Sequence, residues 1–263
     1  MQTFEANGVV TAYRKSGKGE PIVLLHGGEA DHAMFDGLAR ILAAHFTVIA
    51  YDQRDSGATR NPPSPYSLAD LADDAAALIR GLGYDRAHVM GTSLGGQIAQ
   101  VLAARHPDSI DRLILSSTWK VNRSPLEVNA DAFRTLAAWR ADTAANAPRI
   151  AEFFFPPECL RERPELIEIF RGSSRDQGQK ARRGALLAQP VAADLAAFGG
   201  PVLLIAGSED RLIPNGETFA LAREFPRAQT RTIAQAGHVS SIQAPERVAE
   251  AVTAFLSSKE KAA

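Results

Sequence analysis

Short apolar runs alternate with amphipathic segments over most of this 263-residue chain. Six short runs have the composition of strands, and they cover residues 21–25, 46–51, 88–90, 113–115, 201–206 and 229–234. Loose alternation over residues 4–13, interrupted by Asn7-Gly8, predicts two further antiparallel strands. Between the later strands, apolar residues recur at helical spacing. This alternation predicts an α/β fold with a mostly parallel, eight-stranded sheet that is covered by helices on both faces.

The alternation stops between Trp119 and Gly200. No buried strand is predicted there, and Ala, Arg, Glu and Pro dominate short helical stretches over residues 131–143 and 165–172. We therefore predict a helical cap over residues 119–199, inserted after the sixth strand. The core is then formed by residues 1–118 together with residues 200–263.

Aromatic residues are concentrated in the predicted cap, which contains both tryptophans and a run of three phenylalanines. A cap above a binding site must present some surface to it, and these aromatic side chains predict an apolar roof. We expect Trp119, Trp139 and Phe154 to contact the substrate.

Composition and charge indicate which partners and which cellular location to expect. The net charge of −1 gives no electrostatic reason to expect nucleic acid or an anionic membrane as a partner. The single cysteine, Cys159, excludes an internal disulfide, and no run is apolar enough for a membrane span. The first residues lack a signal-peptide pattern, so we expect a cytoplasmic protein, either a monomer or a homodimer.

A serine between two glycines is the most informative local pattern in the chain. Gly91-Thr92-Ser93-Leu94-Gly95 follows a short apolar strand and is followed at once by an amphipathic stretch. This strand–turn–helix context is the one in which a G-x-S-x-G sequence forms a nucleophile elbow. Glycines are needed two residues either side because the turn is too tight for side chains there.

Two further residues lie just past the ends of predicted strands. Asp210 follows the strand over residues 201–206, and His238 follows the last strand. The carboxyl ends of strands are where open α/β sheets build their sites. The chain order Ser93, Asp210, His238 is also the one that accompanies this elbow.

At this point the sequence resembles the α/β-hydrolase superfamily over almost the whole chain outside residues 120–197. The resemblance rests on the elbow and on four other signatures: His26-Gly27, the segment Tyr51-Asp52-Gln53-Arg54-Asp55-Ser56-Gly57, the run from Gly207 to Pro214, and Gly237-His238. One departure is visible, because relatives usually read D-x-R-G-x-G where this chain has Asp55 in place of the first glycine. That change affects no predicted catalytic residue, but we expect it to alter the loop geometry or the surface charge beside the site.

The resemblance implies a role for each predicted site residue. Ser93 is the expected nucleophile, His238 its base, and Asp210 the acid that orients His238. Glu209 is the alternative acid, and the family spacing to Pro214 favours Asp210. The backbone N–H groups of Gly28 and Leu94 are the expected oxyanion hole.

Other polar residues near the predicted site are expected to have roles other than catalysis. Glu29 follows the Gly27-Gly28 turn and is expected to pair with an arginine, to shape substrate choice, or to be a solvated turn residue. His26, Asp52 and Arg54 are expected to brace their loops. No metal-ligand spacing and no phosphate-binding G-x-G-x-x-G follows a strand, so we expect neither a metal nor a cofactor.

The predicted function is hydrolysis of a small, largely apolar carboxylic ester or lactone through an acyl-enzyme on Ser93, as in the carboxylesterases and enol-lactone hydrolases of this superfamily. A serine at the elbow excludes relatives that need a carboxylate nucleophile there, the haloalkane dehalogenases and epoxide hydrolases. Two alternatives stay open. One is a C–C bond or aminopeptidase-like hydrolase with the same triad, and the other is a slow-turnover ligand sensor of this fold.

Overall fold

Eight strands form one sheet in the computed structural model, which describes residues 1–172, 174–188 and 191–258. Their order across the sheet is β1-β2-β4-β3-β5-β6-β7-β8. The first two strands run antiparallel to their neighbours, and the other six are parallel to one another. The strands are β1 (Gln2–Ala6), β2 (Val9–Ser16), β3 (Pro21–Leu25), β4 (Thr47–Tyr51), β5 (Ala87–Thr92), β6 (Ile110–Ser116), β7 (Val202–Gly207) and β8 (Ala228–Ile233). The predicted fold class is confirmed.

Helices cover both faces of this sheet. The α-helices are α1 (Asp36–Leu42), α2 (Leu68–Gly81), α3 (Leu94–Arg105), α4 (Pro125–Trp139), α5 (Thr143–Phe154), α6 (Pro157–Glu162), α7 (Gln177–Ala188), α8 (Asn215–Phe219), α9 (Ser240–Gln243) and α10 (Pro245–Leu256). The 3₁₀ segments are η1 (His32–Phe35), η2 (Pro107–Ser109), η3 (Arg140–Asp142), η4 (Pro164–Phe170), η5 (Leu195–Ala197) and η6 (Ala220–Arg223).

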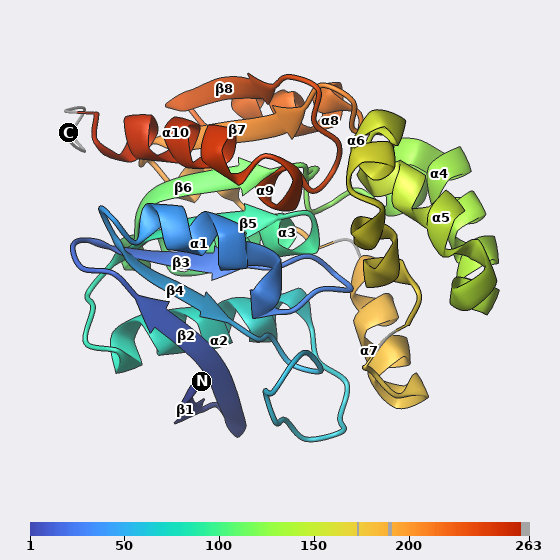
Figure 1. Cartoon of the computed structure of the whole chain (residues 1–263). Helices are drawn as coiled ribbons and strands as arrows, with labels where there is room; N and C mark the ends of the chain where they lie inside the picture. The colour runs from blue at the N-terminus through green and yellow to red at the C-terminus, as the bar shows by residue number, and fades with distance from the viewer. Residues whose placement is uncertain (173, 189–190, 259–263) are drawn as a thin grey trace.

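The central strands divide their apolar side chains between two cores, because successive residues of a strand point to opposite faces. In β3, Val23 and Leu25 pack with α2 and α3, whereas Ile22 and Leu24 pack with α1 and α10. Figure 1 shows α1 and α10 on one side of the sheet and α2 on the other. Strands buried on both faces explain why the sequence of β3 is apolar at every position.

The segment between β6 and β7, residues 119–199, is called here the helical insert. Its described part contains α4 to α7 and η3 to η5 but no strand. Figure 1 shows α4 to α7 beyond the carboxyl ends of the parallel strands, at the edge where the predicted site residues lie.

Two helices predicted in the helical insert differ from those observed. The helix predicted over residues 131–143 is part of α4, which begins at Pro125 after a capping box of Ser124 and Glu127, is kinked at Asn129, and ends at Trp139. The helix predicted over residues 165–172 is the 3₁₀ segment η4.

Candidate active site

Ser93 occupies a strained turn between β5 and α3. Its backbone has φ 56° and ψ −120°, a combination that non-glycine residues rarely adopt. The turn leaves no space beside it: a Cβ on Gly91 would lie 2.2 Å from the carbonyl oxygen of Gly95, and one on Gly95 would lie 2.0 Å from that of Leu25. Both glycines are therefore required by the close packing of the turn, and the serine side chain projects from a fixed backbone.

The end of β6 holds this turn in place. The backbone N–H of Ser93 donates to the carbonyl oxygen of Ser116 at 3.0 Å. The carbonyl oxygen of Ser93 accepts a hydrogen bond of 2.8 Å from the hydroxyl of Thr118. The Thr118 side chain also fills the space next to Gly96, where an added Cβ would lie 2.6 Å from it. The strain at Ser93 is thus balanced by contacts from the neighbouring strand.

Asp210 and His238 form a buried hydrogen-bonded pair beyond the ends of β7 and β8. Oδ2 of Asp210 lies 2.9 Å from Nδ1 of His238, and their side chains are 0% and 3% exposed. The other carboxylate oxygen, Oδ1, accepts the backbone N–H groups of Leu212 and Ile213 at 3.0 and 2.8 Å. A carboxylate fixed at both oxygens favours the imidazole tautomer with its proton on Nδ1, which leaves Nε2 as a proton acceptor.

The rival acid lies apart from this pair. Glu209 is exposed, and its backbone N–H donates to the carbonyl oxygen of Ala236 at 2.8 Å. It is therefore Asp210 whose carboxylate is hydrogen-bonded to His238.

The loop after β3 lies against the elbow. A Cβ on Gly27 would lie 3.7 Å from the Cβ of Ser93, and one on Gly28 would lie 3.7 Å from the Leu94 side chain. Leu94 is the first residue of α3, so its N–H has no acceptor within the helix. The structure thus brings the two predicted oxyanion-hole residues, Gly28 and Leu94, next to each other and to Ser93.

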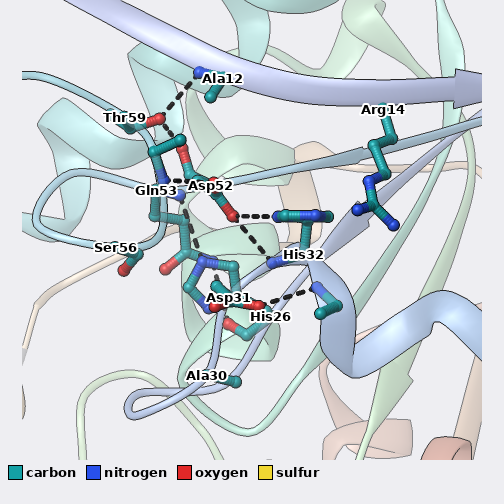
Figure 2. Close-up of polar contacts among 12 residues, drawn as sticks. Ala12, Arg14, His26, Ala30, Asp31, His32, Asp52, Gln53, Ser56 and Thr59 are labelled. Carbon is teal, nitrogen blue, oxygen red and sulfur yellow. Dashed lines mark hydrogen bonds and ion pairs between the residues drawn. The ribbon is translucent and has the colours of Figure 1, made fainter. Parts of the chain in front are cut away.

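The buried side chain of His26 braces the same loop. Nδ1 lies 2.8 Å from the carbonyl oxygen of Gly27, and Nε2 accepts the backbone N–H of Gln53 at 3.2 Å. The Gln53 side chain in turn donates to the carbonyl oxygen of His26 at 2.9 Å, as Figure 2 shows. Burial and the nearby charge of Arg183 hold the pKa of His26 well below its usual value. His26 is consequently a neutral structural residue, as the sequence predicts.

Three arginines in or just before α7 of the helical insert reach the loops beside the elbow. Arg183 is buried and donates to the carbonyl oxygens of Gly28 and Arg54 and to Oε1 of Gln53, each at 3.0 Å. Burial and the charge of Arg175 lower the pKa of Arg183 to about 10, so the guanidinium stays charged at neutral pH. The sequence analysis missed this residue.

The other two arginines bind the loop after β4. Arg182 makes two hydrogen bonds to the Asp55 carboxylate, at 2.7 and 2.8 Å. Arg175 donates to the carbonyl oxygens of Asp55 and Ala30 and to the Ser56 hydroxyl. Asp55 replaces the glycine of the family pattern and adopts φ 56°, a left-handed conformation that aspartate tolerates. Because Asp55 is buried, its charge needs a cation close by, and Arg182 supplies it.

With this geometry established, comparison with known proteins identifies the family. Residues 20–245 match the sequence model of the α/β-hydrolase fold. The chain belongs to the α/β-hydrolase fold family. The resemblance predicted from its motifs is confirmed.

Individual members of this family differ in their substrates. The chain is 32% identical over 224 residues to the provisionally named carbamate hydrolase RutD of Caulobacter sp. (strain K31), covering 82% of each protein. It is 29% identical over 265 residues to 2-hydroxymuconate semialdehyde hydrolase of Pseudomonas putida, covering 95% of this chain and 92% of that one. The enol-lactonase of Burkholderia xenovorans LB400 has a similar structure, with a TM-score of 0.82, 26% identity and coverage of 98% and 100%.

The predicted substrate-contacting residues of this α/β hydrolase have different surroundings. Phe154 is half-buried, and its ring meets the His238 ring edge-on with 5.5 Å between centroids. Trp119 is buried against Phe133, and Trp139 packs against Phe153. Phe154 is therefore the aromatic candidate with a described contact to the predicted triad.

The acidic candidate beside the oxyanion loop has a partner in the helical insert. Glu29 is exposed and accepts a hydrogen bond of 2.7 Å from Arg140. This ion pair connects the loop after β3 to the segment between α4 and α5. Of the alternatives expected for Glu29, it corresponds to the pairing with an arginine.

One cluster in the described residues has side chains of metal-binding type, namely Asp31, His32 and Asp52. Both carboxylate oxygens of Asp52 and Nδ1 of His32 are already used in hydrogen bonds within the protein, whereas Nε2 of His32 is buried and has no partner among the described residues. Oδ1 of Asp52 accepts both Nδ1 and the backbone N–H of His32, and Oδ2 accepts the N–H of Ala58. Figure 2 shows Asp52 between His32 and the loop of Gln53. These bonds make the cluster a brace for two loops, in line with the structural role expected for Asp52.

No helix in the described part of the chain is long and apolar enough to cross a membrane.

Proposed function

We propose that this α/β hydrolase cleaves a small, largely apolar carboxylic ester or lactone through an acyl-enzyme on Ser93. The observation that carries the proposal is the buried Asp210–His238 hydrogen bond of 2.9 Å at the sheet edge where Ser93 occupies the strained elbow. A serine hydroxyl is a weak nucleophile at neutral pH and needs an oriented base, and this pair supplies one.

In the proposed reaction, Nε2 of His238 accepts the hydroxyl proton as Oγ of Ser93 attacks the substrate carbonyl carbon. The N–H groups of Gly28 and Leu94 stabilise the resulting oxyanion. When this intermediate collapses, the bond to the leaving oxygen breaks and the imidazolium returns its proton to that oxygen. Water then attacks the acyl-enzyme with His238 again as base, which releases the carboxylic acid and restores Ser93.

We further propose that the helical insert acts as a cap and that its apolar side chains favour apolar substrates. Its cluster of Trp119, Val128, Ala132, Leu136 and Ile150 continues onto Leu212 and Ile213, which follow Asp210 in the chain. Phe154 borders His238 at the same edge. The enol-lactonase with the similar structure supports ester-type chemistry.

Two other bonds are candidates for cleavage by the same residues. The relative named as a carbamate hydrolase favours a carbamate, whose carbonyl is attacked in the same way. The semialdehyde hydrolase favours the C–C bond alternative. A panel of apolar esters, lactones, carbamates and vinylogous diketones distinguishes the three, because the substrate with the highest kcat/KM identifies the bond.

The proposal is tested by labelling and turnover in the same samples. A fluorophosphonate probe is expected to label the protein once, on Ser93, and the protein is expected to hydrolyse p-nitrophenyl acetate. Ser93→Ala should abolish both, while Ser16→Ala, which changes an exposed serine at the end of β2, should keep both. Labelling that persists in Ser93→Ala would refute the assignment. A protein that labels but turns over no member of the panel would be a ligand sensor.

A further inference from the structure

The loop that carries the proposed oxyanion donor has two consecutive glycines, Gly27 and Gly28. Neither has a side chain that could restrict the backbone or pack it in place. A catalytic hydrogen-bond donor must nevertheless be fixed in advance, since stabilisation of the oxyanion depends on a preorganised N–H. The orientation of the Gly28 N–H must therefore come from contacts made by the neighbouring peptide groups.

Both peptide groups adjoining the Gly28 Cα are held by hydrogen bonds. The Gly27 carbonyl, in the same peptide plane as the Gly28 N–H, accepts from Nδ1 of His26 at 2.8 Å. The Gly28 carbonyl, in the next peptide plane, accepts from Nε of Arg183 at 3.0 Å. One bond comes from the core and the other comes from α7 of the helical insert.

We propose that Arg183 is a positioning residue that fixes the oxyanion donor of Gly28 and makes its alignment depend on the docked helical insert. The inference rests on the proposed function. Arg183 acts through the Gly28 carbonyl, so its contribution is expected in the stabilisation of the oxyanion rather than in substrate binding.

The geometry of the guanidinium supports this role. Its three nitrogens each donate to a different acceptor: Nε to Gly28, Nη1 to the Arg54 carbonyl and Nη2 to Gln53. Gln53 in turn donates from Nε2 to the His26 carbonyl, so a chain of hydrogen bonds runs from Arg183 to His26. Arg183 thus connects both braces of the Gly27-Gly28 turn. A lysine has one nitrogen and cannot reproduce a planar fork of three donors.

Arg182 provides a matched control on the same helix. It also joins α7 to the core, but its two hydrogen bonds go to the Asp55 side chain and none of these bonds reaches the Gly27-Gly28 turn. Arg183→Lys and Arg182→Lys are therefore the same chemical change at neighbouring positions. Only the first removes the fork that holds Gly28.

The experiment compares kcat and KM for p-nitrophenyl acetate in the wild type and in both lysine variants. For Arg183→Lys we expect kcat to fall about 10- to 100-fold, as for a small displacement of a catalytic group, with KM changing less than about threefold. The inhibition constant of a trifluoromethyl ketone, which forms an oxyanion on the serine, should rise by the same factor as kcat/KM falls. For Arg182→Lys we expect values within about twofold of the wild type.

A second variant tests the guanidinium itself. Arg183→Ala should lose at least as much kcat, and added ethylguanidine should restore part of it while ethylamine should not. If Arg183→Ala does not fold, the lysine variant alone decides. An unchanged kcat in Arg183→Lys, or a rise in KM alone, would overturn the inference.

Hydrogen exchange separates this inference from the proposed function. The peptide covering residues 27–31 should exchange faster in Arg183→Lys than in Arg182→Lys or the wild type. This result does not depend on any substrate. A wild type that neither hydrolyses esters nor binds the trifluoromethyl ketone would refute the proposed function. Unchanged exchange in Arg183→Lys would refute the positioning role.

Discussion

The rings of Phe154 and His238 form a T-shaped pair, with 5.5 Å between the two centroids and 74° between the ring planes. Phe154 belongs to the helical insert, and its carbonyl oxygen also accepts the N–H of Val239 at 3.4 Å. A residue of the insert therefore borders the base of the predicted triad through both its ring and its backbone.

We expect Phe154→Ala to change the preference among acyl groups. Burial of apolar surface contributes about 25 cal/mol per Å², so loss of one aromatic wall should cost about 1–2 kcal/mol of binding for a bulky acyl group. The ratio of kcat/KM for a hexanoate over an acetate ester should fall about tenfold. Phe153→Ala is the control, because the ring contacts of Phe153 are with Trp139 and Arg211. Equal ratios in both variants would contradict the prediction.

Asp210→Asn should lower kcat by about 10³- to 10⁴-fold. The amide cannot stabilise the imidazolium and favours the wrong tautomer of His238, although it keeps the size of the carboxylate. Thermal unfolding should show that the variant remains folded. Glu209→Gln is the matched control and should leave kcat within about twofold, because Glu209 is exposed. Comparable losses in the two variants would show that the acid has been assigned wrongly.

His26 should remain neutral in the folded protein below the pH at which an ordinary histidine takes up a proton. Burial and the charge of Arg183 lower its pKa, and its Nδ1 proton is held by the Gly27 carbonyl. NMR of ¹⁵N-labelled histidine should show the imidazole of His26 still neutral, in the Nδ1–H form, at pH 5.5. His26→Asn identifies the signal by removing it, and protonation of that signal near pH 6.5 would contradict the prediction.

The lowered pKa of His26 should also make the free energy of unfolding depend on pH. The unfolded chain binds the proton first, at about pH 6.5, because the pKa is lower in the folded state. The stabilisation is therefore present above pH 6.5 and is lost as the pH falls towards the folded-state pKa. The limiting slope is about 1.4 kcal/mol per pH unit for this one proton. Urea unfolding between pH 7.5 and 5 measures it, and His26→Asn should have the shallower slope.

Asp55→Asn should weaken the attachment of α7 to the loop after β4. The Asp55 side chain is 3% exposed, and loss of its charge leaves Arg182 without a carboxylate. We expect the free energy of unfolding to fall by about 2–3 kcal/mol, less than for a fully buried pair because Arg182 is partly exposed. Asp36→Asn breaks the surface pair with Arg14, in which Asp36 is 56% exposed, and should cost less than about 1 kcal/mol.

The stabilisation that the Asp55 carboxylate contributes should also depend on pH. Burial alone would raise the pKa of Asp55, but hydrogen bonds from Arg182 and Asn61 outweigh it and leave the pKa below its usual value. The stabilisation is present above about pH 4, where the unfolded carboxyl ionises, and is lost as the pH falls through the folded-state pKa. Acid unfolding of Asp55→Asn should lack this contribution. Parallel acid limbs in wild type and variant would contradict it.

The sequence predicted the sheet and the positions of Ser93, Asp210 and His238 because their signals are local. A strand buried on both faces must be apolar throughout, and the elbow must place glycines beside its serine. These requirements fall within a few residues of one another. The predictions for Ser93, Asp210 and His238 as catalytic residues await the experiments above.

The helical insert was harder to predict because its structure depends on distant contacts. Pro148 lies inside α5, where it normally disfavours a helix, and the carbonyl of Ala144 that it leaves without a partner accepts a hydrogen bond from Arg171. Likewise, nothing near Arg183 in the sequence indicates that it reaches Gly28. The departure of Asp55 from the family glycine was visible in the sequence, but its partner Arg182 lies 127 positions away and only the burial of Asp55 in the structure explains the pairing.

The contact of Arg183 with Gly28 spans 155 positions of the chain, which has a consequence for biosynthesis. A ribosome releases Gly28, Ser93 and the surrounding strands well before α7, and the residues Asp210 and His238 come later still. Contacts between such distant segments form late because the chain between them must first be ordered. In the nascent chain, the proposed nucleophile Ser93 therefore lacks its proposed partners until the last third of the chain has been made. A truncated product is expected to be inert rather than indiscriminately reactive.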